Sequence, residues 1–167
     1  MCDFSFLKKY VLPSEHIQAP LDFKHEFYPV GKREMEAAEK RLNRKFPKEL
    51  REFYLQIGYG FMWTVKDRMS INRIMDPDSV ADLLLGENVY EDYYLADEFA
   101  EEPQLFPFFE VGDDIMISLD LSLETDNGNH PVDYTGLKVA NSLEEFLRKL
   151  DAEQDYYVRF TYEEDED

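Results

Sequence analysis

The middle of the sequence lacks basic residues. Residues 74–137 contain 17 acidic residues and no lysine or arginine, whereas residues 1–73 carry a net charge of +4. The whole chain of 167 residues has a net charge of −19 at pH 7. Such a charge disfavours binding to a nucleic-acid backbone or to an anionic membrane. It favours a cationic partner instead, so we predict a basic protein partner, no nucleic acid and no membrane.

Cysteine and long apolar runs are also scarce. Cys2 is the only cysteine, so no internal disulfide can form, which is typical of proteins in a reducing cytoplasm. No apolar run approaches the roughly 20 residues needed to span a bilayer. Residues 1–16 have no basic segment ahead of an apolar one, as a signal peptide would have. Together these absences predict a soluble, cytoplasmic protein.

Common catalytic and metal-binding motifs are missing from the sequence. It has no GxSxG, HExxH, Walker or GxGxxG motif. His16, His25 and His130 are far apart and are interpreted as surface or turn residues. Asp113 and Asp114 are more typical of a polar hairpin turn than of a cation site. We therefore predict no enzymatic activity, cofactor or metal, and leave open a carboxylate pair that only the fold would bring together.

Aromatic residues, in contrast, are abundant. The chain has 13 Phe and 11 Tyr, and 44% of its residues are hydrophobic, which is too many for a disordered chain. Its length suggests one domain with a real core. Trp63, Phe106, Phe108 and Phe109 fall in strand-like patterns, which favours a place in that core over a ligand-stacking site.

Apolar spacing predicts two amphipathic helices in the first half of the chain. Met35, Ala38 and Leu42 recur at intervals of three and four residues in the first helix. The second begins near Pro47, which suits a first helical turn, and Gly58 is expected to close it in a left-handed conformation. We expect these two helices to pack side by side.

Alternating apolar residues and turn signals predict a run of mostly antiparallel strands. The expected strands are 61–65, 70–75, 105–111, 115–121, 131–134 and 137–140, with a further edge strand at 156–162. A helix is expected between Asp76 and Gly86, and another after the capping box Ser142–Glu145. Residues 1–30 and 87–102 show no clear pattern. The predicted fold is α+β, a mostly antiparallel twisted sheet with an N-terminal helical pair and a C-terminal helix packed against it.

Residues 87–102, ENVYEDYYLADEFAEE, combine seven acidic and four aromatic residues with no basic one. Tyrosines offer a large, rigid contact area with a hydroxyl group, and the acids speed encounter with a basic partner. We therefore interpret the stretch as a surface for a positively charged protein, with a solvated loop as the alternative. The predicted contact residues are Glu91, Asp92, Tyr93, Tyr94, Asp97, Glu98, Glu101 and Glu102.

Three segments together resemble the SUKH superfamily, which includes the Smi/Knr-like, cell-wall assembly regulator-like domains. The first is MEAAEKRLNRKFPKELREFYLQIGYG followed by FMW, in which Glu39, Leu42, Pro47, Leu50 and Gly58 match the family's helical pair. FFEVGDDIMISLDL resembles its central hairpin, and HPVDYTGLKVANSLEEFLRKL resembles its closing strands and helix. The order and spacing of the three segments carry the resemblance.

The resemblance implies a single SUKH-like domain over residues 1–167, with its core at 32–151, an acidic insertion at 87–102 and an acidic tail at 163–167. It also implies an α+β domain without a conserved catalytic set. Many bacterial members are immunity proteins that bind and neutralise a toxin, often a nuclease, and others are regulatory or scaffold domains. We therefore expect an immunity protein for a basic, nuclease-type toxin, and as the alternative a regulatory or scaffold domain with an ordinary intracellular partner. The oligomeric state stays open, and a homodimer is compatible with an edge strand at 156–162.

Overall fold

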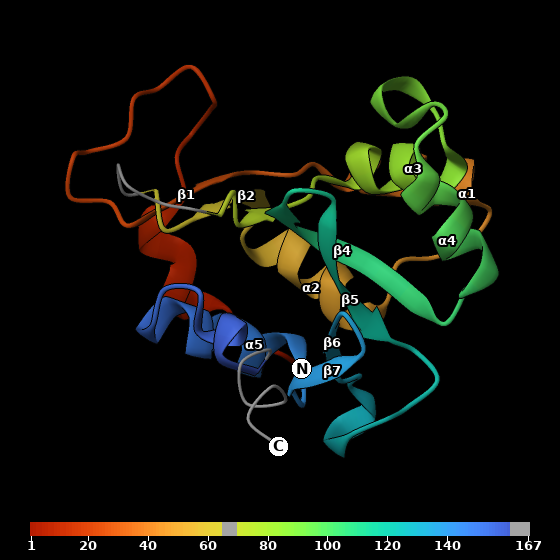
Figure 1. Ribbon diagram of the computed structural model, residues 1–167. Coiled ribbons are helices and arrows are strands. Elements are labelled where there is room, and N and C mark those ends of the chain that lie inside the picture. Colours follow the sequence, from red (N-terminus) through yellow and green to blue (C-terminus); the bar gives the residue numbers. More distant parts are fainter. Residues whose placement is uncertain (65–69, 161–167) are drawn as a thin grey trace.

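The computed structural model describes residues 1–64 and 70–160, and in this part a seven-stranded sheet has its strands in the order of the sequence (Figure 1). All neighbouring strands are antiparallel. The strands are β1 (His25–Tyr28), β2 (Tyr59–Met62), β3 (Arg73–Ile74), β4 (Leu105–Gly112), β5 (Ile115–Asp120), β6 (Val132–Tyr134) and β7 (Leu137–Ala140). The structure confirms the predicted α+β fold with a mostly antiparallel sheet.

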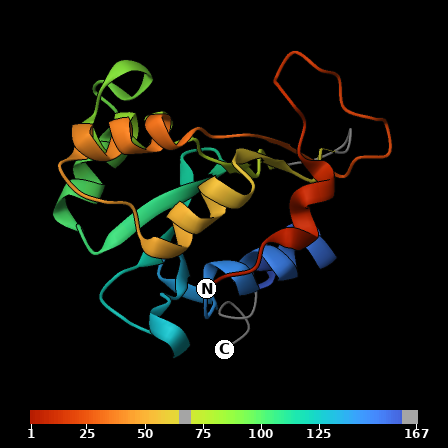
Figure 2. The same cartoon turned by 180° about the vertical axis from the view of Figure 1, so that it is seen from behind.

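Helices lie against the sheet and beside it. They are α1 (Lys32–Leu42), α2 (Lys48–Gln56), α3 (Pro77–Leu85), α4 (Tyr94–Glu101) and α5 (Leu143–Ala152), with 3₁₀ turns η1 (Ser5–Tyr10), η2 (Asn88–Tyr90), η3 (Asp126–Gly128) and η4 (Tyr156–Val158). Helix α2 crosses one face of the sheet, while α1, α3 and α4 gather on one side and α5 on the other (Figures 1 and 2). The main neighbour of α1 is α3, and its contact with the predicted neighbour α2 is smaller.

Local capping signals place two of these helices where the sequence predicted them. The Asp76 carboxylate accepts a hydrogen bond from the Ser79 N–H, and Pro77 occupies the first turn of α3. At the start of α5, the Ser142 hydroxyl oxygen accepts a hydrogen bond from the Glu145 N–H at 3.1 Å. Both caps depend on residues within one turn of each other, so the sequence alone was sufficient to identify them.

The strand β1 was not predicted, because its pairing partner β2 lies about 30 residues further along the chain. Two glycines make this pairing possible. A Cβ atom on Gly58 would lie 1.9 Å from the Tyr28 carbonyl oxygen, and one on Gly60 would lie 2.0 Å from that of Glu26. Gly58 has φ of +128°, so it admits the neighbouring strand and does not form the left-handed helix cap that we expected.

Several predicted strands are shorter than expected or are replaced. Strand β2 ends at Met62, β3 is limited to Arg73–Ile74, and Val65 with the turn at 66–68 lies outside the described residues. The predicted edge strand at 156–162 is wrong for its described part, where Tyr156 and Tyr157 form η4 and are both buried. Residues 161–162 lie outside the description.

Tertiary contacts explain the replacement of that edge strand. The Tyr156 hydroxyl donates to the Val139 carbonyl oxygen at 2.8 Å, and the Tyr157 hydroxyl donates to Asn72 Oδ1 at 2.5 Å. Alternating aromatics normally point to opposite faces of a strand. Here both neighbouring rings turn into the same core and contact Phe146. The edges of the described sheet are therefore β1 and β7.

The core confirms the interpretation of the three strand phenylalanines, whereas Trp63 follows β2 and lies at the margin of the core. Phe106, Phe108 and Phe109 are fully buried, and the first of them contacts Phe46. Trp63 is half-buried, and its indole N–H donates to the carbonyl oxygen of Leu150. These side chains serve packing and do not line an open stacking site.

His25 is a core residue, which corrects its interpretation as a surface or turn histidine. Its ring is fully buried, Nδ1 accepts a hydrogen bond from the Trp63 N–H at 3.0 Å, and Nε2 lies 2.8 Å from the Asp151 carboxylate. Because Nδ1 is an acceptor, the proton of the neutral ring is on Nε2, which donates to Asp151. Burial lowers the pKa of His25.

We expect His25 to make the free energy of unfolding depend on pH. Its pKa is lower in the folded state than in the unfolded chain, so its contribution is complete above about pH 6.5 and is lost as the pH falls below that value. Each proton taken up on unfolding changes stability by at most about 1.4 kcal/mol per pH unit. Urea unfolding of wild type and His25→Gln at several pH values should show a smaller acid loss in the variant. His16→Gln, at an exposed position, is the control, and identical pH profiles for all three proteins would contradict the expectation.

Candidate partner-binding site

The acidic segment 87–102 is an ordered part of the fold, formed by η2, a turn and α4. Tyr90 and Leu95 are buried and attach the segment to the core. Tyr93 lies between Tyr90 and Tyr94, with ring centroids 5.5 and 5.4 Å away. The segment is therefore held as a firm surface by its own aromatic side chains.

The predicted tyrosines differ in what they contact. The Tyr93 hydroxyl donates to the carboxylate of Asp114, at the tip of the β4–β5 hairpin. Burial and this hydrogen bond raise the pKa of Tyr93, so its hydroxyl remains a donor. Tyr94, in contrast, is 52% exposed. Tyr93 links α4 to the hairpin, and Tyr94 is the residue of this pair that offers contact area to a partner.

The six predicted carboxylates all lie on the surface of this segment. They are Glu91, Asp92, Asp97, Glu98, Glu101 and Glu102. Within the described residues, none of them forms an ion pair with a lysine, arginine or histidine. We call this set, together with Tyr94, the α4 acidic face. Its charge is available to a partner.

Acidic residues just before this face form ion pairs within the chain. Arg41 of α1 contacts Asp78 at 3.3 Å, Asp82 at 2.6 Å and Glu87 at 3.0 Å. Arg41 reaches these carboxylates because α1 packs closely against α3. Within the described residues, the carboxylates of this acidic run are therefore ion-paired up to Glu87, and those of the segment from Glu91 to Glu102 are not.

A groove of about 670 Å³ runs between α4 and the outer side of strands β5 and β6. One wall is lined by residues four positions apart, Tyr94 and Glu98 of α4 and Glu102 directly after it. The opposite wall comes from alternate residues of β5, Met116, Ser118 and Asp120, and from Asp133 of β6. Leu95 and Phe99 add apolar surface between the walls.

Carboxylates crowd around this groove. Glu98, Glu102, Asp114, Asp120 and Asp133 all line it. Partial burial raises the pKa of Asp133, and the nearby charges of Asp120 and Glu102 raise it further, although the Gly136 N–H lowers it. The groove therefore combines apolar surface with a strongly negative potential.

The sequence identified one wall of the groove but not the other. Asp114, Asp120, Asp133 and Ser118 were not predicted as contact residues. The available signal was the alternation in 115–121, which placed Met116, Ser118 and Asp120 on the side opposite the core. Only the fold shows that α4 lies beside that side. The hairpin-turn interpretation of Asp113 and Asp114 is confirmed, since both have positive φ between β4 and β5.

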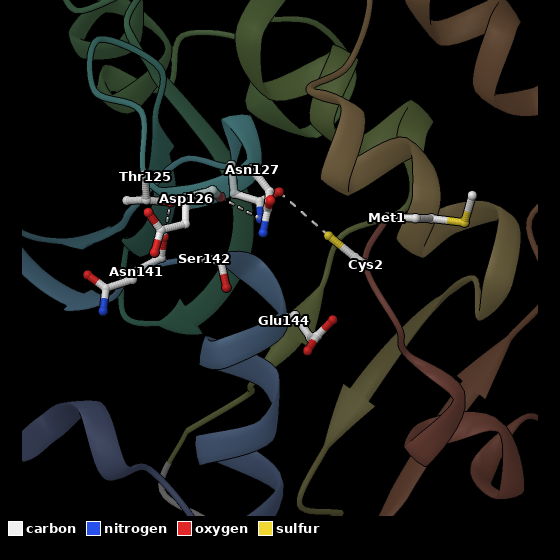
Figure 3. Close-up of a pocket in the computed structure, with 9 residues that line it drawn as sticks. Met1, Cys2, Thr125, Asp126, Asn127, Asn141, Ser142 and Glu144 are labelled. Atoms are coloured by element: carbon white, nitrogen blue, oxygen red, sulfur yellow. Dashed lines mark hydrogen bonds between the residues drawn. The ribbon is translucent and has the colours of Figure 1, made fainter.

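A second pocket, of about 560 Å³, lies beside Cys2 and the start of α5 (Figure 3). Cys2 Sγ lies 3.7 Å from Asn129 Oδ1. The backbone N–H of Cys2 donates a hydrogen bond to the Glu52 carboxylate. Burial, followed by the hydrogen bond and charge of Glu52, raises the pKa of Cys2 to about 12. The thiol therefore stays protonated at neutral pH and is a poor nucleophile.

His130, another side chain with possible catalytic chemistry, is paired with a carboxylate of the fold. His130 Nδ1 lies 2.6 Å from Glu49 Oε1, joining the β5–β6 connection to α2. In residues 1–64 and 70–160, no group of three or more His, Cys, Asp or Glu side chains is arranged to hold a metal ion. Nor does any helix in those residues have the length and apolar character needed to cross a bilayer.

The sequence of this chain is similar to those of known proteins. Residues 32–147 match the sequence profile of SUKH_6, described as SMI1-KNR4 cell-wall. The matched range runs from α1 into α5 and includes the α4 acidic face and the groove. Over 137 residues the chain is 40% identical to the Bacillus subtilis (strain 168) protein named "Immunity protein YxxD", covering 80% of this chain and 88% of that protein.

Proposed function

Because the chain belongs to the SMI1-KNR4 cell-wall (SUKH) family, we propose that it is an immunity protein that binds a toxin and covers the toxin's basic surface. The α4 acidic face carries this proposal, since its six carboxylates are exposed and have no ion pair within the described residues. Similarity to the immunity protein of Bacillus subtilis supports it. The protein itself would perform no chemistry.

The proposed target is a toxin of the nuclease type. A nuclease holds the phosphates of its substrate with lysine and arginine side chains. Carboxylates placed on those side chains would occupy the substrate's position, and the field of a protein of charge −19 would speed the encounter. The block would be both steric and electrostatic, and it would act in the cytoplasm, where such a toxin meets nucleic acid.

Co-expression with a toxin domain that co-purifies with this chain from its native cells tests the proposed function. Cells that make both proteins should grow, and the two proteins should co-purify at low salt and separate more readily at high salt. Toxin-only cells, and cells that make the toxin with an unrelated acidic protein, are the controls. Failure of the wild-type chain to protect would refute the proposal. Recovery of an ordinary intracellular partner in place of the toxin would favour the regulatory or scaffold alternative.

A further inference from the structure

We propose that the groove between α4 and strands β5–β6 receives an arginine or lysine side chain of the toxin, which enters over Ser118 and Asp133. This inference rests on the proposed immunity function and specifies how the partner is recognised. It makes the groove, and not only the exposed α4 acidic face, the centre of the interface.

The apolar surface of the groove suits the stem of a long cationic side chain. Leu95 and Phe99 from α4 and Met116 from β5 all line it. Lysine and arginine bury their methylene groups on such surfaces and keep the charged end in a polar environment. An aromatic ring such as that of Phe99 also attracts a cation at its face.

The polar floor of the groove contains a hydroxyl, that of Ser118, without a hydrogen-bond partner in the described residues. Ser118 and Asp133 are directly opposite each other in the β5–β6 pairing. Ser118 is only 3% exposed, it lines the groove, and within the described part of the chain its hydroxyl makes no hydrogen bond. The Ser118 hydroxyl oxygen is not one of the fully enclosed atoms, so it is reached from the groove. A hydroxyl with free hydrogen-bonding capacity in the floor of a groove favours a ligand that brings a donor to it.

The charge of the groove selects the ligand. Its five carboxylates are accompanied by no lysine, arginine or histidine among the described lining residues. Like charges brought this close disfavour the free protein, and a cation between them relieves the repulsion. The carboxylates are too dispersed to form a metal site in the described residues. A long side chain from a basic partner supplies the missing charge at the required depth.

Asp120→Asn with Asp133→Asn tests the groove directly. These substitutions remove charge but keep the oxygen atoms that accept from the Ser122 and Gly136 N–H groups. Titration of the ¹⁵N-labelled full chain with a capped hexa-arginine peptide should shift the amide signals of Phe99, Ser118 and Asp133, and a hexa-citrulline peptide should not. The double variant should bind the arginine peptide at least about tenfold more weakly. Glu15→Gln with Asp22→Asn, an equal change of charge at exposed sites outside the groove, should change affinity less than about twofold.

A second readout separates recognition from folding. The groove variant should unfold at a higher urea concentration than wild type, because the repulsion between its carboxylates is reduced, while it binds more weakly. Loss of both stability and binding would show a structural role and overturn the inference. So would peptide shifts confined to residues outside the groove, or equal weakening in the control variant. If the groove variant still binds and neutralises the toxin like wild type, the groove inference fails and the immunity function stands. If wild type does not protect cells, the immunity function fails.

Discussion

Replacing Glu98, Glu101 and Glu102 with lysine is expected to weaken binding to the toxin by about 100-fold or more. Each reversal removes an attraction and places like charges against the basic partner. All three residues lie in the last turn of α4 or directly after it, where positive charge favours the helix dipole, so the helix should remain folded. Isothermal titration at fixed low salt measures the loss, and the remaining affinity should depend less on salt than that of wild type.

A matched reversal elsewhere is the control for net charge. Glu15→Lys, Asp22→Lys and Glu36→Lys alter the charge by the same amount at exposed positions outside the α4 acidic face and the groove. We expect this variant to lose about tenfold or less, because screening by salt weakens charges that are far from the interface. Equal losses in the two variants would show that net charge, and not the α4 acidic face, drives binding. Unchanged affinity in the α4 variant would move the interface to another surface.

Phe146→Ala is expected to lower the free energy of unfolding by about 3–5 kcal/mol, because it empties a large site in the core. Phe146 is fully buried in α5, and its ring contacts Phe108 at 5.8 Å and Phe109 at 5.3 Å between centroids. The same ring also contacts Tyr156 and Tyr157. The substitution therefore loosens the contact of α5 with β4 and with η4 together.

Urea unfolding of Phe146→Ala beside Leu55→Ala provides the measurement and its control. Leu55 lies on α2 but is 54% exposed, so its truncation should change stability by no more than about 0.5 kcal/mol. Phe146→Leu should retain part of the lost stability, because it leaves a smaller cavity. A loss below about 1 kcal/mol for Phe146→Ala would mean that the core around α5 closes over the vacant space.

Most elements of regular structure could be predicted because their signals are local. The Asp76 and Ser142 caps act within one helical turn, and the alternation in 115–121 correctly indicates a strand, β5. Its prediction of a half-buried strand is wrong, because Met116 and Ser118 on the other side are buried as well. The failures are non-local. β1 depends on the close approach that Gly58 and Gly60 allow, and Tyr156 and Tyr157 adopt a 3₁₀ turn because their hydroxyls find partners in distant segments.

The candidate site was likewise predictable only in part from the sequence. Composition and charge were sufficient to identify Glu91 to Glu102 as an acidic surface, because a run of carboxylates with no basic neighbour in sequence is visible without a fold. Which carboxylates remain unpaired was not visible. Arg41 forms ion pairs with Asp82 and Glu87 from a helix about 40 residues earlier in the chain.

The amino-acid sequence was therefore sufficient for the fold class and for the likeness to the SUKH family, since each depends on composition or on spacing along the chain. That the partner is basic remains a prediction from the charge of the chain. The groove required the tertiary structure. Its walls come from α4, β5 and β6, and the register of β5 on β6 sets Ser118 opposite Asp133 beneath α4. Chain segments that are distant in sequence meet only when the sheet closes and the helices pack, so the site they form exists only in the folded protein.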